Sequence, residues 1–292
     1  MPLQHFDALI LDDGLHNAQC TINKRSDMSD YRLMSWNVNG IRAVAKKKVD
    51  AKGTTFQQFL QEEGADIVCL QETKAHARDL PQHITHIPGF FSYFAQATRK
   101  GYSGVALYTR KEPLSVQTSL GIAEFDDEGR TIIAEYDDFV LCTAYFPNGG
   151  ASEDRLAYKL RYYDAFLEYV TKRAITGEKV VICGDVNTAH MERDLSRPIE
   201  NQHKSGFLTI ERAWIDQLIG AGFIDTLRMF TQEPGHYTWW DYKTRARERN
   251  VGWRLDYFFV YETLKNTVRS ASILTEITGS DHCPVTLDLS FQ

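Results

Sequence analysis

The chain has 292 residues, of which 43% are hydrophobic and 25% charged, as in a packed globular protein. Its net charge of -6 argues weakly against indiscriminate nucleic-acid binding, but leaves a local basic patch open. We find no stretch apolar enough to span a membrane and no signal peptide, and therefore expect a soluble cytoplasmic protein, nuclear in a eukaryote, with no membrane partner.

The length suits one large domain or two small ones, and large single-domain α/β proteins of this size are ordinary; no linker is found. Five cysteines lie at positions 20, 69, 142, 183 and 283 without a Cys-x-x-Cys spacing, and three of them sit inside apolar runs. We interpret them as buried free thiols in a reducing compartment, and do not expect a disulfide framework or a zinc site. A monomer is the default expectation.

The first thirty residues differ from the rest of the chain. They contain five Asp against Lys24 and Arg25, and their only apolar cluster is at 9–11. We predict a mobile tail over 1–30 and a single catalytic domain over 31–292.

The first predicted strand, at 33–40, ends in Asn37, Asn39 and Gly40. A basic segment follows, in which five cations fall within eleven residues: Arg42, Lys46, Lys47, Lys48 and Lys52. Such a segment forms either a phosphate-facing patch or a solvated helix face, and the pattern alone does not decide between them.

The next stretch has the pattern of a βαβ unit. Helical spacing over 56–63 leads to an apolar strand over 66–72, which ends in Gln71 and Glu72. A glutamate at the end of a buried strand is a candidate functional residue, although it can also simply end an edge. Further strands, with antiparallel character, are predicted over 101–108, 130–136 and 139–146.

The segment 179–190 joins core sequence directly to polar groups. After a long predicted helix over 153–176, the apolar run 180–183 indicates a central strand covered on both faces. Gly184 allows a turn, and Asp185, Asn187 and His190 follow at the strand's carboxyl end, where α/β folds tend to place their sites. An ordinary Asx turn is the alternative. For His190 we predict a structural hydrogen-bonding role.

The last third of the chain adds further polar groups to predicted strands. A helix over 210–220 precedes the segment 235–250, where aromatic side chains alternate with cations in a way that suits base stacking and phosphate contact. The strand predicted over 253–260 carries Asp256 in apolar surroundings. Asp281 and His282 then lead into the final strand.

Six short strings, in this order, connect the chain to a known family. They are Ser-Trp-Asn-Val-Asn-Gly-Ile-Arg, Leu-Gln-Glu-Thr-Lys, Tyr-Phe-Pro-Asn, Cys-Gly-Asp-Val-Asn-Thr-Ala-His, Asn-Val-Gly-Trp-Arg-Leu-Asp-Tyr and Gly-Ser-Asp-His-Cys-Pro. Over about residues 31–291 the chain resembles the exonuclease III family of abasic-site endonucleases. The wider endonuclease, exonuclease and phosphatase superfamily shares only some of these elements, and the Trp-Arg-Leu-Asp block points to its DNA-repair branch.

The resemblance implies a fold, an activity and a cofactor. The fold is a four-layer α/β sandwich of the deoxyribonuclease I type, with two mixed sheets packed face to face and helices outside. The activity is Mg²⁺-dependent cleavage 5′ to an abasic site in double-stranded DNA, with 3′-phosphodiesterase or 3′→5′ exonuclease activity on blocked 3′ ends. The implied Mg²⁺ ligands, which also suit Mn²⁺, are Asn39, Glu72 and Asp281. Asn39 stands where some relatives have Asp, so the site is one charge weaker.

The resemblance also implies roles at the reacting phosphate. Asp185, oriented by Asn187, would deprotonate or position the attacking water. His282, paired with Asp256, would face a phosphate oxygen. The remaining cradle residues would be Tyr145, Asn37 and Asn148. Whether Asp185 or a Tyr145 phenolate activates the nucleophile stays open.

The implied DNA contacts are more scattered. They are Arg42, Lys47, Gly101, Tyr102, Arg155, Asn201, Trp239, Lys243, Trp253 and Leu255. The last two and Trp239 would wall a pocket for a flipped-out abasic sugar, or they belong to the core. Ala151 and Lys243 stand where one branch of the family places intercalating side chains, so damage recognition here would use other residues.

Two competing functions remain. A superfamily phosphatase or phosphodiesterase acting on an inositol phosphate or lipid headgroup is one, and the Arg- and Trp-rich segment 239–254 argues against it. A DNA-binding module without catalysis is the other. The intact residues Glu72, Asp185, Asp256, Asp281 and His282 argue against that.

Overall fold

The computed structural model describes residues 29–292. The predicted tail therefore lies outside the described residues, except for its last two, which open the first strand: the Ser29 hydroxyl donates a hydrogen bond to Asp138 at 2.7 Å. Within the described part of the chain, no helix combines the length and apolar character needed to cross a bilayer.

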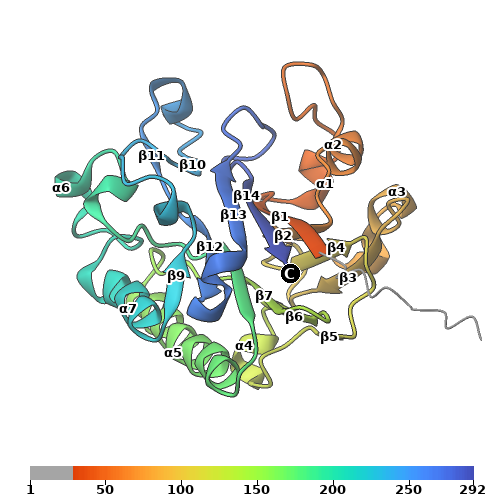
Figure 1. Cartoon of the computed structure of the whole chain (residues 1–292). Helices are drawn as coiled ribbons and strands as arrows, with labels where there is room; N and C mark the ends of the chain where they lie inside the picture. The colour runs from red at the N-terminus through yellow and green to blue at the C-terminus, as the bar shows by residue number, and fades with distance from the viewer. Residues whose placement is uncertain (1–28) are drawn as a thin grey trace, which may run out of the picture.

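Two six-stranded mixed sheets form the centre of the molecule (Figure 1). The first contains, in spatial order, β13 (Val268–Ile273), β14 (Val285–Phe291), β1 (Ser29–Asn37), β2 (Ile67–Gln71), β4 (Val105–Thr109) and β3 (Phe91–Ala95). The second contains β5 (Ser115–Gln117), β6 (Thr131–Glu135), β7 (Val140–Tyr145), β8 (Val180–Asp185), β12 (Asp256–Tyr261) and β9 (Phe223–Asp225). The pairs β1/β2 and β7/β8 are parallel, and the other pairs are antiparallel.

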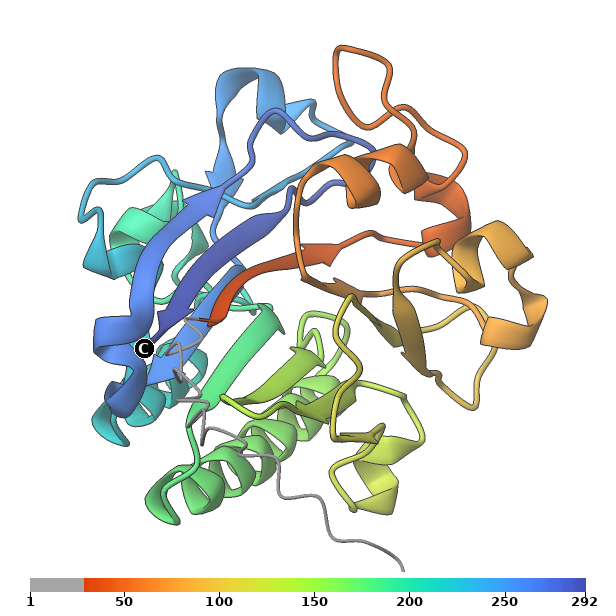
Figure 2. The ribbon, with the colours of Figure 1, turned by 45° about the vertical axis from the view of Figure 1, so that its right-hand side comes forward.

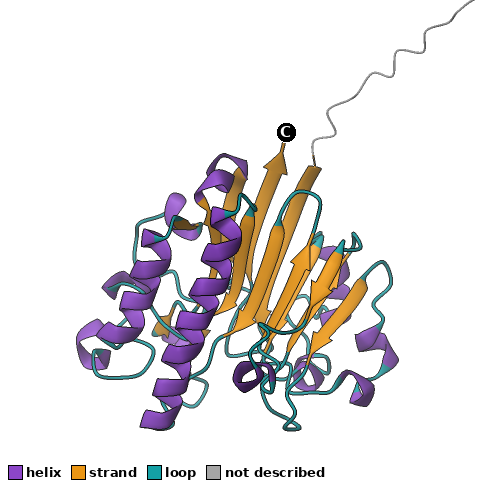
Figure 3. Cartoon of the chain, turned by 90° about the horizontal axis from the view of Figure 1, so that it is seen from below, coloured by secondary structure: helices purple, strands orange, loops and turns teal. Residues whose placement is uncertain are grey.

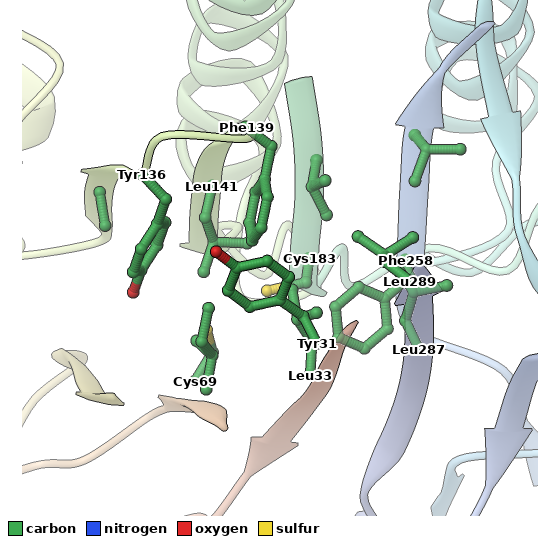
Figure 4. Packing of buried hydrophobic residues seen from close by; sticks show 14 of the residues in the cluster. Tyr31, Leu33, Cys69, Tyr136, Phe139, Leu141, Cys183, Phe258, Leu287 and Leu289 are labelled. Atoms are coloured by element: carbon green, nitrogen blue, oxygen red, sulfur yellow. The ribbon is translucent and has the colours of Figure 1, made fainter. Parts of the chain in front are cut away.

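The two sheets pack face to face over a shared core (Figure 4). Leu33 of β1 and Leu287 of β14 meet Leu141 of β7 and Phe258 of β12 in this layer, and all four side chains are buried. Apolar contact between the inner faces, which is proportional to the area removed from water, is what holds the sheets together.

Helices cover both outer faces (Figures 2 and 3). The first sheet packs its outer side chains against α1 (Ile41–Val44), α2 (Phe56–Glu62) and α3 (Gln82–Thr85). The second packs against α4 (Ala123–Asp126), α5 (Glu153–Ile175) and α7 (Thr209–Gly220). The predicted four-layer α/β sandwich is confirmed.

Burial on both faces explains the unbroken apolar runs in the central strands. In β8, Val181 and Cys183 point into the layer between the sheets, whereas Val180 and Ile182 point toward the helices. Neither side of the strand meets water, so period-two alternation is absent. Four cysteines, at positions 69, 142, 183 and 283, are buried free thiols as predicted, and Cys20 lies outside the described residues.

Short elements complete the chain. A two-stranded ribbon pairs β10 (Trp239–Trp240) with β11 (Gly252–Trp253), and α6 is Pro198–Asn201. The 3₁₀ turns are η1 (Ala77–Asp79), η2 (Glu192–Asp194), η3 (Leu227–Met229), η4 (Ala246–Arg249) and η5 (Glu262–Thr267).

Most predicted elements are present, with three differences in their bounds. The strand predicted over 33–40 begins at Ser29 and ends at Asn37, because the backbone turns at Asn39, where φ is 45°. The strand predicted over 101–108 begins only at Val105, because Ser103 and Gly104 adopt φ angles of 49° and 92° and form a turn. The strand predicted over 253–260 is interrupted between β11 and β12, where the backbone N–H of Arg254 bonds to the Asp194 carbonyl at 2.7 Å.

Candidate functional site

Polar side chains from both sheets meet in one cavity of about 660 Å³ at a shared edge of the sandwich. Parallel pairing of β7 with β8 sets Tyr145 beside Asp185, and antiparallel pairing of β12 with β8 sets Asp256 beside Asp185 as well. Of the predicted site residues, the cavity is lined by Asn39, Glu72, Tyr145, Asn148, Asp185, Asn187, Asn201, Trp239, Trp253, Leu255, Asp281 and His282.

The end of β8 is fixed by close packing. Gly184 has a φ angle of 137°, and a Cβ atom there would lie 1.9 Å from the carbonyl oxygen of Ala144, so only glycine fits. The strand therefore ends with Asp185 in the lining of the cavity, where its side chain is 1% exposed.

Asp185 is surrounded by donors. Its Oδ2 accepts a hydrogen bond from Asn37 Nδ2 at 2.8 Å, and its Oδ1 accepts one from the backbone N–H of Asn187 at 2.8 Å. Asn187 is held in turn by donating to the Phe146 carbonyl at 2.9 Å and accepting from Asn148 Nδ2 at 3.2 Å. Asn37 does not line the cavity and acts from behind Asp185.

Four non-glycine cavity residues adopt left-handed backbone conformations. The φ angles are 45° at Asn39, 57° at Glu72, 51° at Lys74 and 55° at Asn187. This region is tolerated by asparagine but is rare for glutamate, and strained residues of this kind cluster at functional sites. The turn at Glu72 directs its side chain toward the cavity.

His282 lies between two buried carboxylates. Its Nδ1 is 2.7 Å from Asp256 Oδ2, and its Nε2 is 3.8 Å from Asp185 Oδ2. Thr238 donates its hydroxyl to Asp256 Oδ2 at 2.6 Å and fixes that carboxylate. The other carboxylate oxygen, Asp256 Oδ1, is buried without a hydrogen-bond partner.

These surroundings shift the pKa values of the site. Burial opposes charge on His282, but Asp256 and Asp185 outweigh it and raise the pKa of His282 to about 10. Burial also raises the pKa of Asp185 well above its usual range, against the opposing effect of His282. Burial, followed by Glu72 and Asp185, raises the pKa of the Tyr145 phenol well above its usual value. These shifts favour the imidazolium form of His282 and the neutral form of the Tyr145 phenol.

A second chain of contacts links the predicted metal ligands. Lys74 Nζ lies 2.7 Å from Glu72 Oε1 and 2.5 Å from Asn39 Oδ1, and Asn39 Nδ2 donates to Asp281 Oδ1 at 2.9 Å. Trp239 Nε1 donates to Asp281 Oδ2 at 3.1 Å. Lys74 has no predicted role from the sequence, although it lies in one of the six strings. Its contact with Glu72, two residues away, depends on the turn at that glutamate.

Two donor sets in this region have the chemistry of a metal site. Asp185, Asp256 and His282 place candidate ligand atoms within 4.8 Å of one another. His282 is a poor ligand there, because its Nδ1 is paired with Asp256 and its raised pKa favours the protonated ring. In the second set, Glu72 and Asn39 already direct oxygens at one cation, the Lys74 ammonium. Hard divalent cations prefer such oxygens.

One wall of the cavity is apolar. Trp239, Trp253 and Leu255 pack with Phe207 and Leu195, so these residues belong to a small core cluster and also line the cavity. The sequence left open whether these residues wall a pocket or belong to the core, and they do both. Asn201 of α6 lies on the same cavity, and its amide donates to the Arg197 carbonyl at 2.7 Å.

The remaining predicted DNA contacts lie outside the cavity. Arg42, Lys47, Gly101 and Lys243 are exposed. Lys47 Nζ donates to the Gly279 carbonyl at 2.7 Å. Gly279 is two residues before Asp281, so Lys47 contacts the segment that carries this predicted metal ligand. Within the basic segment, only Arg42 lies in a helix; Lys46, Lys47, Lys48 and Lys52 are exposed outside regular helix. Tyr102 and Arg155 border a second, smaller hollow.

Several polar residues are buried and form structural hydrogen bonds or ion pairs. Lys159 of α5 is fully buried and bonds to Glu211 at 2.7 Å and to the Asn187 carbonyl at 2.7 Å. Arg254 lies between Asp194 and Asp225. His190 is buried, with Nε2 at 2.7 Å from Asp216, and has the structural role predicted for it.

Comparison with known proteins gives consistent matches. The model of the endonuclease/exonuclease/phosphatase family matches residues 34–282. An exodeoxyribonuclease of Bacillus subtilis is 41% identical over 259 residues, covering 88% of this chain and 98% of that protein. The DNA repair nuclease APEX1 of Danio rerio is 40% identical over 272 residues, covering 92% and 85%. The structure of an AP endonuclease from Archaeoglobus fulgidus superposes with a TM-score of 0.77 at 27% identity, covering 88% and 98%.

Proposed function

We propose a substrate and a cofactor for this chain, which belongs to the endonuclease/exonuclease/phosphatase family and is a DNA-repair nuclease of the AP endonuclease and exodeoxyribonuclease III type. It cleaves the phosphodiester 5′ to an abasic site in double-stranded DNA with the help of Mg²⁺. The observation that carries the proposal is the convergence of Asp185, His282 and Glu72 on one cavity with an apolar wall. A phosphate placed there meets a base, a cation and metal-ligating oxygens together.

Asn39, Glu72 and Asp281 would hold the metal. Their fit is supported by Lys74, since its ammonium is a cation that two of these residues already share. A bound Mg²⁺ would neutralise charge that develops on the phosphate and its leaving oxygen. Trp239 fixes one Asp281 oxygen by donating to it, which leaves the ligand oriented.

Asp185 is the group best suited to take the proton of the attacking water. Its carboxylate is buried, its orientation is fixed by donors from Asn37 and Asn187, and its raised pKa brings it nearer to neutral pH, where general bases work best. The raised pKa of the Tyr145 phenol makes a phenolate costly, which supports Asp185 over Tyr145 as the activating group. Tyr145 and Asn148 would instead line the phosphate cradle.

His282 would stabilise negative charge on a non-bridging phosphate oxygen. Its imidazolium form is maintained by Asp256, and Thr238 holds that carboxylate in place. A preorganised cation in a water-poor site is worth more to the transition state than the same charge in water. Thr238 thus acts through Asp256 and has no direct part in the reaction.

The apolar wall would select the lesion. An abasic deoxyribose has no base to stack or to hydrogen-bond, so it can turn into a pocket made by Trp239, Trp253 and Leu255 at a lower cost than a paired nucleotide. The same phosphate site would serve blocked 3′ ends, which gives the 3′-phosphodiesterase and 3′→5′ exonuclease activities. The exposed cations Arg42, Lys47 and Lys243 would contact the duplex backbone.

A test uses a duplex with one abasic site, labelled at the 5′ end of the damaged strand. The expected product ends in a 3′-hydroxyl at the nucleotide before the lesion, which identifies cleavage on the 5′ side. A product cut on the 3′ side of the lesion would refute the proposal. Loss of terminal nucleotides alone, without incision at the lesion, would also refute it and indicate an exonuclease.

A further inference from the structure

One carboxylate outside the cavity holds two arginines at once. Glu128 follows α4, and its Oε1 accepts a hydrogen bond from Arg155 Nη1 at 2.8 Å while its Oε2 accepts one from Arg130 Nε at 2.6 Å. Arg130 is 2% exposed, and the Glu128 side chain is 19% exposed. Charge-assisted bonds of this kind are the strong ones among protein hydrogen bonds, and two on one carboxylate fix both guanidinium groups.

Both arginines also donate to the same phenol. The Tyr102 hydroxyl lies 3.1 Å from Arg130 Nη2 and 3.0 Å from Arg155 Nη2. The loop that carries Tyr102 is bonded to the segment just after Glu72, through Lys74 N–H to the Ser103 carbonyl at 2.8 Å. Tyr102 is therefore next in sequence to Ser103, which is bonded to Lys74 of the cavity lining.

Arg130 continues the network to the active site itself. Its Nη1 donates to the backbone carbonyl of Tyr145 at 2.8 Å, and its guanidinium lies 4.8 Å from the centre of the Tyr145 ring. A cation over an aromatic face at this distance is attractive. One buried arginine thus contacts Tyr102, Tyr145 and Glu128.

The backbone beside Glu128 leaves it little freedom. Gly129 has a φ angle of 57°, and a Cβ atom there would lie 2.3 Å from the backbone carbon of Gln96. The adjoining turn is bonded to the same segment, with the Thr98 N–H donating to the Asp127 carbonyl at 2.8 Å. The carboxylate is placed by a close packing of two turns, which only glycine at position 129 permits.

We infer that Glu128 is a positioning residue, which holds Tyr102 and Arg155 in place for the DNA backbone and ties them through Arg130 to Tyr145. The inference rests on the proposed function, because it takes Tyr102 and Arg155 as duplex contacts. It predicts in which direction duplex affinity changes when the carboxylate is removed. By charge alone, a carboxylate next to a phosphate backbone opposes binding, so its removal would tighten binding. A positioning carboxylate does the opposite, because its loss releases both contacts.

The experiment compares Glu128→Gln with Glu124→Gln. Glu124 lies one turn earlier and pairs with the exposed Arg161, so its removal deletes a similar charge without touching the network. Affinity for a duplex with one abasic site is measured in chelator, which blocks cleavage, and the single-turnover rate is measured with Mg²⁺ at saturating enzyme. Melting temperatures report folding.

Glu128→Gln is expected to weaken duplex binding by about tenfold, the effect of losing a hydrogen bond to a charged group. Glu124→Gln is expected to leave binding unchanged or slightly tighter. In a Tyr102→Phe background, the Glu128→Gln change should cost much less than in the wild type, because the two residues act through one network. Glu128→Asp, which keeps the charge, should bind better than Glu128→Gln.

Binding by Glu128→Gln that is equal to or tighter than wild type, or full additivity with Tyr102→Phe, would overturn the inference. A change in duplex affinity equal to that of Glu124→Gln would overturn it as well, since the effect would then not depend on the contacts that Glu128 makes with Arg130 and Arg155. Failure of the proposed function looks different: the wild type itself would neither bind nor cut the abasic duplex, and both proposals would fall together.

Discussion

Replacing Asp185 with Asn separates catalysis from binding. Asparagine keeps the shape of the side chain but cannot take a proton at neutral pH. Because Asp185 is the proposed general base, we expect the turnover of abasic duplex to fall by at least about a hundredfold, the lower range for losing such a group. Affinity should be unchanged or higher, because a negative charge near the substrate phosphate is removed.

The structure also sets the cost to stability. The Asp185 carboxylate accepts from Asn37 Nδ2, from the Asn187 N–H and, at 3.4 Å, from Asn187 Nδ2. An amide offers one oxygen, so at least one of these donors would face an NH₂ group, at a cost of about 1–3 kcal/mol. A domain with a typical stability of about 5–15 kcal/mol survives that loss. The variant should therefore fold, and its rate should report chemistry.

The assay is a single-turnover cleavage rate alongside a dissociation constant for abasic duplex, both with Mg²⁺, with thermal melting as the control for folding. A variant that cuts at a near-normal rate but binds poorly would refute this reasoning. It would make Asp185 a positioning residue and direct attention to Tyr145 as the activating group.

Four further predictions follow from other parts of the molecule. Glu72→Gln should weaken Mg²⁺ binding, measured by calorimetry, and slow cleavage without altering the fold; an unchanged Mg²⁺ dependence would rule out this ligand. Duplex affinity should fall steeply with salt despite the net charge of -6, and less steeply after Lys47→Ala or Lys243→Ala; a flat dependence would mean that these cations point away from DNA. Burial raises the pKa of Asp194, but its arginine partners outweigh burial and lower the pKa to about 2, so its ion pairs should stabilise the fold by roughly 2 kcal/mol above pH 4 and lose this contribution as the pH falls through 2. Asp194→Asn should remove this part of the pH dependence of the free energy of unfolding, measured by chemical denaturation. A chain beginning at Ser29 should melt and cleave like the full chain, since the resemblance to the exonuclease III family begins only at about residue 31; a large drop in melting temperature would contradict the predicted tail.

The strands that carry the site were predictable because the core covers them on both faces. The runs before Glu72 and after Lys179 contain almost no polar residue, and the polar groups that end them therefore stand out. The strands that sequence reasoning missed are short or partly exposed ones at the sheet edges, such as β3 and β5. Half-buried strands of this kind have no continuous apolar run to detect.

Residues that act through tertiary contact could not be found in the same way. Thr238 supports Asp256 from a segment 18 positions away, and Lys159 bonds to Glu211 from 52 positions away. A basic residue in a helix has the same local sequence pattern whether it faces solvent or a buried carboxylate. The interpretation of such residues needs the fold, because burial decides whether a charge is free or paired.

The central claim is tested most directly by one set of parallel reactions. A duplex with a single abasic site, the matched undamaged duplex and an inositol phosphate are each incubated with the enzyme, with Mg²⁺ or with chelator. We predict incision immediately 5′ to the abasic site in Mg²⁺ only, with far slower release of nucleotides from the undamaged duplex and no phosphate release from the inositol phosphate. Hydrolysis of the inositol phosphate without incision of the abasic duplex would contradict the account, and so would equal internal cutting of damaged and undamaged DNA.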